Sequence, residues 1–188
     1  QSAHFGECAQ LSNAGVGLEL SMSDFLDILG VKIAATNLQL ACQSIDLWIK
    51  ERHKTYVCIA PVSTIVDCRQ DLEYLKVVNN AGMATPDGIP LVWLARMRGY
   101  KQVHRTYGPD LMLTLCSFGQ TRGYRHYFYG ATPEVLERLE SRLKKQFQDI
   151  KIVGSFSPGF SRQCQDESPE VLQAINRLRP DILWVGLG

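Results

Sequence analysis

The chain has 188 residues and a formal net charge of +1, with 20 Lys and Arg against 19 Asp and Glu. Apolar residues make up 45% and charged residues 21%, which is typical of a soluble globular domain large enough to bury its own core. The balanced charge argues against broad electrostatic capture of nucleic acid. The sequence contains no apolar run long enough to span a bilayer, and its first residues lack the basic-then-apolar order of a signal peptide.

Six cysteines are present, and their spacing matches neither a zinc site nor a redox pair. Several lie inside apolar runs. We therefore predict reduced, buried thiols and no metal site. The cysteines are Cys8, Cys42, Cys58, Cys68, Cys116 and Cys164.

Residues 1–23 have no firm periodicity, and we expect a weakly structured lead-in before a single domain over 24–188. From residue 37 onward, helical patterns alternate with short apolar runs. Asn37 or Thr36 is a natural cap for the first helix, and Ser63 is a candidate cap for the second. The expected order is a helix at 37–54, a strand at 56–62, a helix at 63–82, a strand at 81–85 and a helix at 89–99, which Gly99 ends.

The second half repeats the alternation. Its clearest helix is 131–147, with Thr132 as cap and Pro133 in the first turn. The other elements expected are a helix at 108–123, a strand at 125–130, a strand at 151–156, a helix at 168–180 and a strand at 181–188. This order predicts an α/β fold: a Rossmann-like, mainly parallel sheet with helices on both faces.

The turn TPDG, residues 85–88, follows a strand directly. Ligands of such folds bind at the carboxyl ends of the strands, so Asp87 should lie at the binding edge, together with 130–132 and 186–188. Asp87 either shapes the turn and caps the next helix, or serves as a general base that takes a proton from an attacking hydroxyl.

The segment 96–110 is the most basic part of the chain. Three interpretations remain open: an ordinary solvated surface, a site where arginines bind phosphate oxygens, or contact with an anionic membrane surface. Its cations are Arg96, Arg98, Lys101 and Arg105, with His104 among them and Tyr100 and Tyr107 interleaved.

Gly130 stands between a predicted strand and a predicted helix, where the helix N-terminus favours anions. Glycines are too few there for a dinucleotide fingerprint, and the sequence has no G-x-S-x-G elbow and no phosphate-loop lysine motif.

Taken together, these motifs resemble the WecG/TagA/CpsF glycosyltransferases. The resemblance covers about residue 30 to the end, with the motifs in the family's order and spacing. They are Asn80-Ala81 through TPDGIPLVW, then RTYGPDL, YFYGATPEV, KIVGSFSPGF and PDILWVGLG.

The resemblance implies an inverting transfer of a sugar, of the N-acetylmannosamine type or glucose, from a UDP-sugar to a polyprenyl-diphosphate-linked saccharide. It implies synthesis of surface polysaccharides such as teichoic acid or exopolysaccharide, in the cytoplasm at the inner face of the cell membrane. No metal and no cofactor are implied.

For the residues, the resemblance makes Asp87 the catalytic base. Arg96, Arg98 and Arg105 are its candidates for stabilising the departing UDP diphosphate. The substrate-binding positions that it implies are Thr85, Pro86, Gly88, Arg105, Gly108, Asp110, Gly130, Gly186 and Gly188.

Two departures from the family pattern accompany the resemblance. Many members carry a Thr-x-Asn after the first of these strands, and here Ile59 and Pro61 stand in those places. The family also continues beyond the final G-L-G, so we expect a core lacking its C-terminal part, which would supply further site groups and membrane contact.

The alternatives are a catalytically degenerate module that binds a nucleotide-sugar or a partner, and an unrelated Rossmann-like oxidoreductase that binds NAD. We also expect a homo-oligomer, because apolar surface near the last strand would favour self-association.

Overall fold

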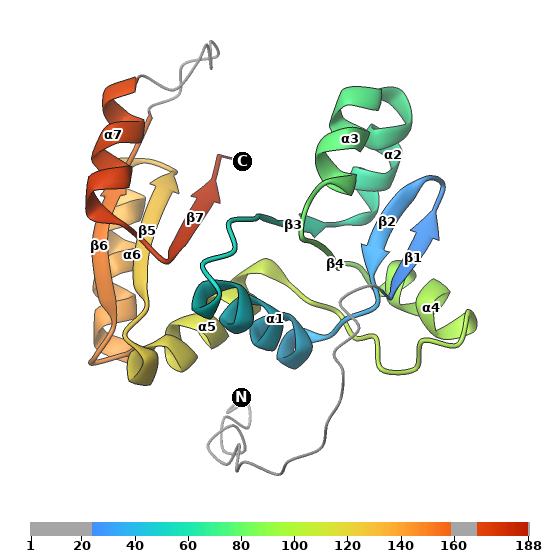
Figure 1. The fold of residues 1–188 in the computed structure, drawn as a ribbon, viewed down its shortest axis with the longest axis horizontal. Helices are drawn as coiled ribbons and strands as arrows, with labels where there is room; N and C mark the ends of the chain where they lie inside the picture. Colours follow the sequence, from blue (N-terminus) through green and yellow to red (C-terminus); the bar gives the residue numbers. More distant parts are fainter. Residues whose placement is uncertain (1–23, 159–168, 188) are drawn as a thin grey trace.

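The computed structural model describes residues 24–158 and 169–187, and its strands form three sheets (Figure 1). The expected lead-in, 1–23, lies outside the described residues. The elements in chain order are β1 (Phe25–Ile28), β2 (Val31–Ala34), α1 (Leu38–Lys50), β3 (Val57–Ala60), α2 (Val62–Gln70), α3 (Leu72–Asn79), β4 (Met83–Pro86), α4 (Ile89–Met97), α5 (Gly108–Arg122), β5 (Arg125–Gly130), α6 (Pro133–Gln146), β6 (Lys151–Phe156), α7 (Pro169–Leu178) and β7 (Ile182–Gly186).

The first sheet is an antiparallel hairpin, β1–β2, which the sequence reading did not predict. Every second residue of its strands is buried, and Gly30 forms the turn at φ +88°, where glycine is unstrained. The Gly30 amide donates to Asp27 Oδ1 at 3.0 Å, which closes the turn.

The second sheet is the parallel pair β3–β4. On one face, Ala60 and Ala84 share a core with α2, α4 and the hairpin. On the other face, Met83 packs in a core with α1 and α5. Helices therefore cover both faces of this pair, as predicted for a parallel sheet.

The third sheet is parallel and has the order β6-β5-β7. Its central strand sends alternate side chains to opposite faces. Phe128 packs against Leu136 and Leu143 of α6, whereas Tyr127 and Tyr129 pack with Ile175 of α7. The predicted class, α/β and Rossmann-like with helices on both faces, is confirmed.

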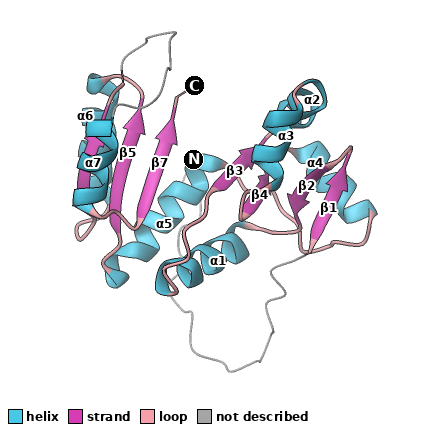
Figure 2. Cartoon of the chain, turned by 45° about the horizontal axis from the view of Figure 1, so that its top comes forward, coloured by secondary structure: helices cyan, strands magenta, loops and turns pink. Residues whose placement is uncertain are grey.

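Helices α1 and α5 connect the two parallel sheets, and Figure 2 shows α5 between β7 and β3, with α1 below β3 and β4. Their core contains Met83 of β4 and includes Trp184 of β7 at its margin. Asp46 links α1 to α5 and the residues that follow it. Its carboxylate pairs with Lys50 of α1 at 2.7 Å and with Arg122 of α5 at 3.1 Å, and it accepts a hydrogen bond from the Tyr124 hydroxyl. Burial alone would raise the pKa of Asp46, but the bonds from Lys50 and Tyr124 lower it overall.

Two predicted caps are confirmed and one is wrong. Asn37 caps α1 and Thr132 caps α6 through side-chain bonds to backbone amides. Ser63 was expected to cap the second helix, but it lies inside α2, whose N-cap is Pro61. The predicted helix over 63–82 is two helices, because Asp71 adopts an extended backbone and caps α3 with its carboxylate.

Cysteines in the described ranges form no disulfide. Cys42, Cys68 and Cys116 are buried, and Cys58 is partly buried. Burial raises the pKa of Cys116 to about 12, so this thiol stays protonated at neutral pH. The reduced thiols predicted from the sequence are present at these four positions; Cys8 and Cys164 lie outside the described residues.

Candidate functional site

Asp87 follows the last residue of β4 and is fixed at both backbone and side chain. Its amide donates to the carbonyl of Ala60, at the end of β3, over 3.1 Å. Its Oδ1 accepts from Arg105 Nε at 3.0 Å, and its side chain is 14% exposed. The carboxylate therefore lies at the carboxyl edge of the β3–β4 pair, within reach of a ligand there.

Arg105 reaches Asp87 because the segment after α4 returns along the end of β4. The Thr106 amide donates to the Pro86 carbonyl at 2.9 Å, and Thr106 is fully buried. The Arg105 guanidinium lies 4.5 Å above the centre of the Tyr107 ring, and its side chain is 47% exposed. Within the described residues, the terminal nitrogens of Arg105 make no further hydrogen bond, so their donors face solvent.

The neighbouring predicted site residues have supporting positions. Thr85 is fully buried, and its hydroxyl donates to the carbonyls of Thr106 at 3.4 Å and Cys58 at 3.5 Å. Pro86 is buried beside it, and Gly88 is the N-cap of α4. These three residues fix the backbone on which Asp87 stands.

Gly108 and Asp110 lie in the first turn of α5. A Cβ on Gly108 would lie 3.5 Å from Ile59 Cγ1, so the helix start approaches β3 closely. Asp110 is exposed.

A second group of predicted residues lies at the carboxyl edge of the other parallel sheet. Gly130 has φ +120°, and a Cβ there would lie 2.1 Å from the carbonyl oxygen of Gly186. The next residue, Ala131, donates its amide to that same carbonyl at 3.0 Å and accepts from Ser157 Oγ at 2.6 Å. Gly130 thus allows the ends of β5 and β7 to meet closely; Gly188 lies outside the described residues.

The structure brings Thr85, Pro86, Asp87, Gly88 and Arg105 together, and places Gly130 and Gly186 on the other sheet. In the described residues no hydrogen bond or ion pair joins these two groups. Arg96 and Arg98, the other arginine candidates, donate to backbone carbonyls elsewhere, at Val103 over 3.1 Å and at Asp27 over 2.7 Å. Of the three, Arg105 is the one that pairs with Asp87.

Ile59 and Pro61, at the positions where a polar pair was expected, have structural roles. Ile59 packs at the margin of the core around α1 and α5. Pro61 is the N-cap of α2 and makes no side-chain cap bond. Neither position supplies a polar side chain to the edge beside Asp87.

Two contributors to the site were not singled out from the sequence. Thr106 anchors the returning segment, and Tyr107 supports the guanidinium of Arg105. The interleaved Tyr107 was visible in the basic segment, but its stacking partner was not. Thr106 lies in the RTYGPDL motif, but the motif does not reveal its role, because that role depends on the end of β4.

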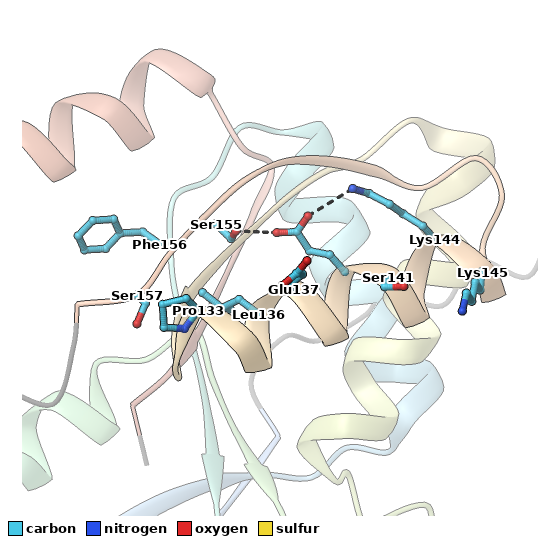
Figure 3. A pocket seen from close by; sticks show the side chains of 10 residues that line it. Pro133, Leu136, Glu137, Ser141, Lys144, Lys145, Ser155, Phe156 and Ser157 are labelled. Carbon is cyan, nitrogen blue, oxygen red and sulfur yellow. Dashed lines mark hydrogen bonds and ion pairs between the residues drawn. The ribbon is translucent and has the colours of Figure 1, made fainter.

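A prominent hollow in the described part of the chain lies elsewhere. It is an open groove of about 730 Å³ between α6 and β6 (Figure 3). Glu140 crosses it, accepting from Ser155 Oγ at 2.6 Å and pairing with Lys144 at 3.3 Å. None of the predicted site residues lines this groove, so we place the candidate site at Asp87.

Comparison with known proteins decides the family. The model of the Glycosyl transferase WecG/TagA/CpsF family matches residues 26–188. The chain belongs to this family. Asp87, Arg105 and the two sheet edges all lie inside the matched region.

Curated relatives share one printed name, N-acetylglucosaminyldiphosphoundecaprenol N-acetyl-beta-D-mannosaminyltransferase. The one from Bacillus subtilis (strain 168) is 29% identical over 119 residues, which are 63% of this chain and 44% of that protein. The one from Staphylococcus aureus (strain NCTC 8325 / PS 47) is 23% identical over 172 residues, which are 90% of this chain and 66% of that protein. The chain thus spans about half the length of the Bacillus relative.

Among the described residues, none of the helices has both the length and the apolarity to cross a bilayer. The same residues contain no cluster of three or more His, Cys, Asp or Glu side chains arranged to bind a metal ion.

Proposed function

We propose that this chain is the core of an inverting glycosyltransferase that moves an N-acetylmannosamine-type sugar or glucose from a UDP-sugar to a polyprenyl-diphosphate-linked saccharide. The observation that carries the proposal is the Asp87–Arg105 pair at the carboxyl edge of β4, inside the family match. The relatives' printed name describes transfer of N-acetylmannosamine to such a lipid-linked acceptor. Peripheral contact with the membrane is part of the proposal, because the acceptor is a lipid.

In the proposed step, Asp87 takes the proton of the acceptor hydroxyl. The hydroxyl oxygen then attacks the anomeric carbon of the donor from the face opposite the diphosphate, and a new carbon–oxygen bond forms. The bond to the diphosphate breaks, and UDP departs with the electron pair, so the anomeric configuration inverts. General-base assistance of this kind contributes about 10²–10⁴-fold to the rate.

Arg105 has two roles in this proposal. Its free terminal nitrogens bind the diphosphate oxygens, where a planar guanidinium binds two oxygens at once. Moving toward the diphosphate would also release Asp87 Oδ1, which Arg105 Nε occupies in the resting structure. Donor binding and exposure of the base would then be one event.

The test is sugar transfer by the full-length protein carrying Asp87→Asn. The amide cannot accept the proton, so we expect the turnover number to fall by about 10²–10⁴-fold. The matched control is Asp149→Asn, an exposed acid in the loop before β6, which should leave turnover unchanged. Undiminished transfer by Asp87→Asn, with the chain folded, would remove Asp87 from the base role.

One observation favours a second candidate, a degenerate module that binds a nucleotide-sugar without transferring it. Ile59 and Pro61 are engaged in packing and in starting a helix, where many family members have polar residues. A full-length protein that binds UDP but neither transfers nor hydrolyses the donor would select this alternative. Measurable turnover would exclude it.

A further inference from the structure

Helix α4 begins two residues after Asp87 and has two apolar faces. The inner face, with Leu91, Val92 and Ala95, is 2–4% exposed and packs in the core around β3 and β4. This burial accounts for the helix as part of the fold, but it does not account for the apolar side chains on its other side.

The outer face has a stripe of large apolar residues spaced by four, which places them on one side of the helix. Ile89 is 47% exposed, Trp93 63% and Met97 83%. Leu94 flanks the stripe at 39%. Scattered single apolar side chains are normal on a surface, but a continuous stripe marks an interaction site.

The surface continues past the start of the helix. Val62 of α2 is 41% exposed, and its Cγ2 would lie 3.4 Å from a Cβ on Gly88. Gly88 adjoins Asp87, so the apolar surface begins at the edge of the candidate site. Helix α4 lies on the side of the molecule away from the three-stranded sheet (Figures 1 and 2).

The segment that carries this stripe has charges of a single sign, although Arg105 pairs with Asp87 and Arg98 lies beside Asp27. Residues 88–108 contain no Asp and no Glu, in a chain with 19 acidic residues. Every Lys and Arg of the segment is exposed: Arg96, Arg98, Lys101 and Arg105. Apolar residues with a rim of cations match an anionic lipid interface, where long basic side chains reach the headgroups while their stems cover apolar surface.

We propose that the outer face of α4 binds the surface of an anionic lipid bilayer, with Ile89, Trp93 and Met97 in the interface and Arg96, Arg98 and Lys101 at the headgroups. This orientation would place Asp87 next to the bilayer, where a lipid-linked acceptor presents its saccharide. The role of the acceptor rests on the proposed function, whereas lipid binding by α4 can be measured without it.

The excess of cations in this segment also distinguishes a bilayer from a second copy of the chain. A symmetric dimer through α4 would bring the cations Arg96, Arg98 and Lys101 of the two copies together, and like charges across an interface repel. An anionic surface instead attracts every cation of the rim.

The experiment is sedimentation of the 188-residue chain with vesicles of phosphatidylcholine alone, or of phosphatidylcholine with about one third phosphatidylglycerol. We expect binding only to the anionic vesicles, weakened by salt. Trp93 provides a second readout, because Trp48 is only 5% exposed and Trp184 packs against the core. Tryptophan emission should shift to shorter wavelength on binding, and brominated lipid should quench it.

Matched variants localise the surface. Met97→Glu should lower vesicle binding by about tenfold or more, whereas Leu172→Glu, at a 49% exposed leucine of α7, should not. Lys101→Gln should lower binding by about fivefold, and Lys145→Gln on α6 should have no effect. Unchanged thermal midpoints would show that the variants fold.

Three results would overturn the proposal: no binding of the wild type to anionic vesicles, equal loss with Leu172→Glu, or light scattering that shows a dimer dissociated by Met97→Glu. Each variant is also titrated with UDP. A wild-type chain that binds UDP but not anionic vesicles would count against this surface alone. Vesicle binding without UDP binding would count against the proposed function alone.

Discussion

At the scale of single residues, the candidate site depends on backbone positions more than on its side chains. Asp87 is fixed by a bond to β3, and Arg105 is fixed by the bond from Thr106 to the end of β4. Thr85 is buried beneath both and bonds to the carbonyls of Cys58 and Thr106. The backbone that carries the two charged groups is therefore fixed before any ligand arrives, which lowers the ordering cost of binding, while the exposed Arg105 side chain can still turn toward a ligand.

Gly130 gives a stability prediction at this scale. Gly130→Ala would combine a left-handed backbone with a Cβ 2.1 Å from the Gly186 carbonyl oxygen, so the ends of β5 and β7 must separate. We expect the free energy of unfolding to fall by about 2–4 kcal/mol, measured by urea denaturation. The control is Gly30→Ala, where φ is +88° but no atom lies within 4 Å of the new Cβ. A loss at Gly130 no larger than the loss at Gly30 would show that the close approach is unimportant.

At the scale of elements, His126 of β5 and Trp184 of β7 link two strands of the sheet. The Trp184 indole donates to His126 Nδ1 at 3.1 Å, and the two rings stack with centroids 6.3 Å apart. His126 is fully buried, and its Nε2 has no partner among the described residues. Burial lowers the pKa of His126 to about 4, although the carboxylate of Asp181 acts in the opposite direction.

This lowered pKa predicts how stability depends on pH. Above about pH 6.5 His126 is neutral in both states and contributes no pH dependence. As the pH falls below 6.5 the unfolded chain binds a proton that the folded chain does not, so the fold loses about 2 kcal/mol by pH 5. Urea denaturation of the wild type and of His126→Gln at pH 7 and pH 5 measures this. Equal losses in the two proteins would contradict the assignment to His126.

The elements also show what the sequence could predict. Strand β5 was predicted with its observed bounds, because its apolar run has clear ends, with Gly123 before it and Gly130 closing it. The hairpin β1–β2 was missed, although Leu26, Ile28, Val31 and Ile33 alternate with polar or exposed positions around Gly30. The alternating pattern of a four-residue strand is short, and it is hard to recognise directly after residues 1–23, to which no element was assigned. Asp71 was missed as a helix boundary because the helical spacing of apolar residues continues through it. Its carboxylate accepts from the amides of Glu73 and Tyr74 at the start of α3, and the spacing does not reveal these bonds.

At the scale of the whole molecule, two parallel sheets share one helical layer. Helices α1 and α5 pack against β3–β4, and their core reaches Trp184 of β7. Both parallel sheets, with their carboxyl edges, therefore pack on the same pair of helices. The sequence placed both Asp87 and Gly130 at sheet edges, because the alternation of strands and helices determines this. The sequence did not predict the ion pair between Asp87 and Arg105. The two residues are 18 apart, and they meet only because of the path that the chain takes after α4.

The exposed face of α4 could not be predicted either. Its sequence, IPLVWLARM, is apolar on both sides, and the sequence does not determine which side is buried. The structure resolves this by packing Leu91, Val92 and Ala95 inward and leaving Trp93 and Met97 outside.

The measurement that tests the central claim most directly is calorimetric binding of UDP to this chain, with GDP and NAD as controls and Arg105→Ala as the variant. The account predicts selective binding of UDP, weakened about tenfold or more by Arg105→Ala, because the guanidinium beside Asp87 binds the diphosphate. Binding of NAD in preference to UDP, or UDP binding that Arg105→Ala leaves unchanged, would contradict a nucleotide-sugar site at Asp87.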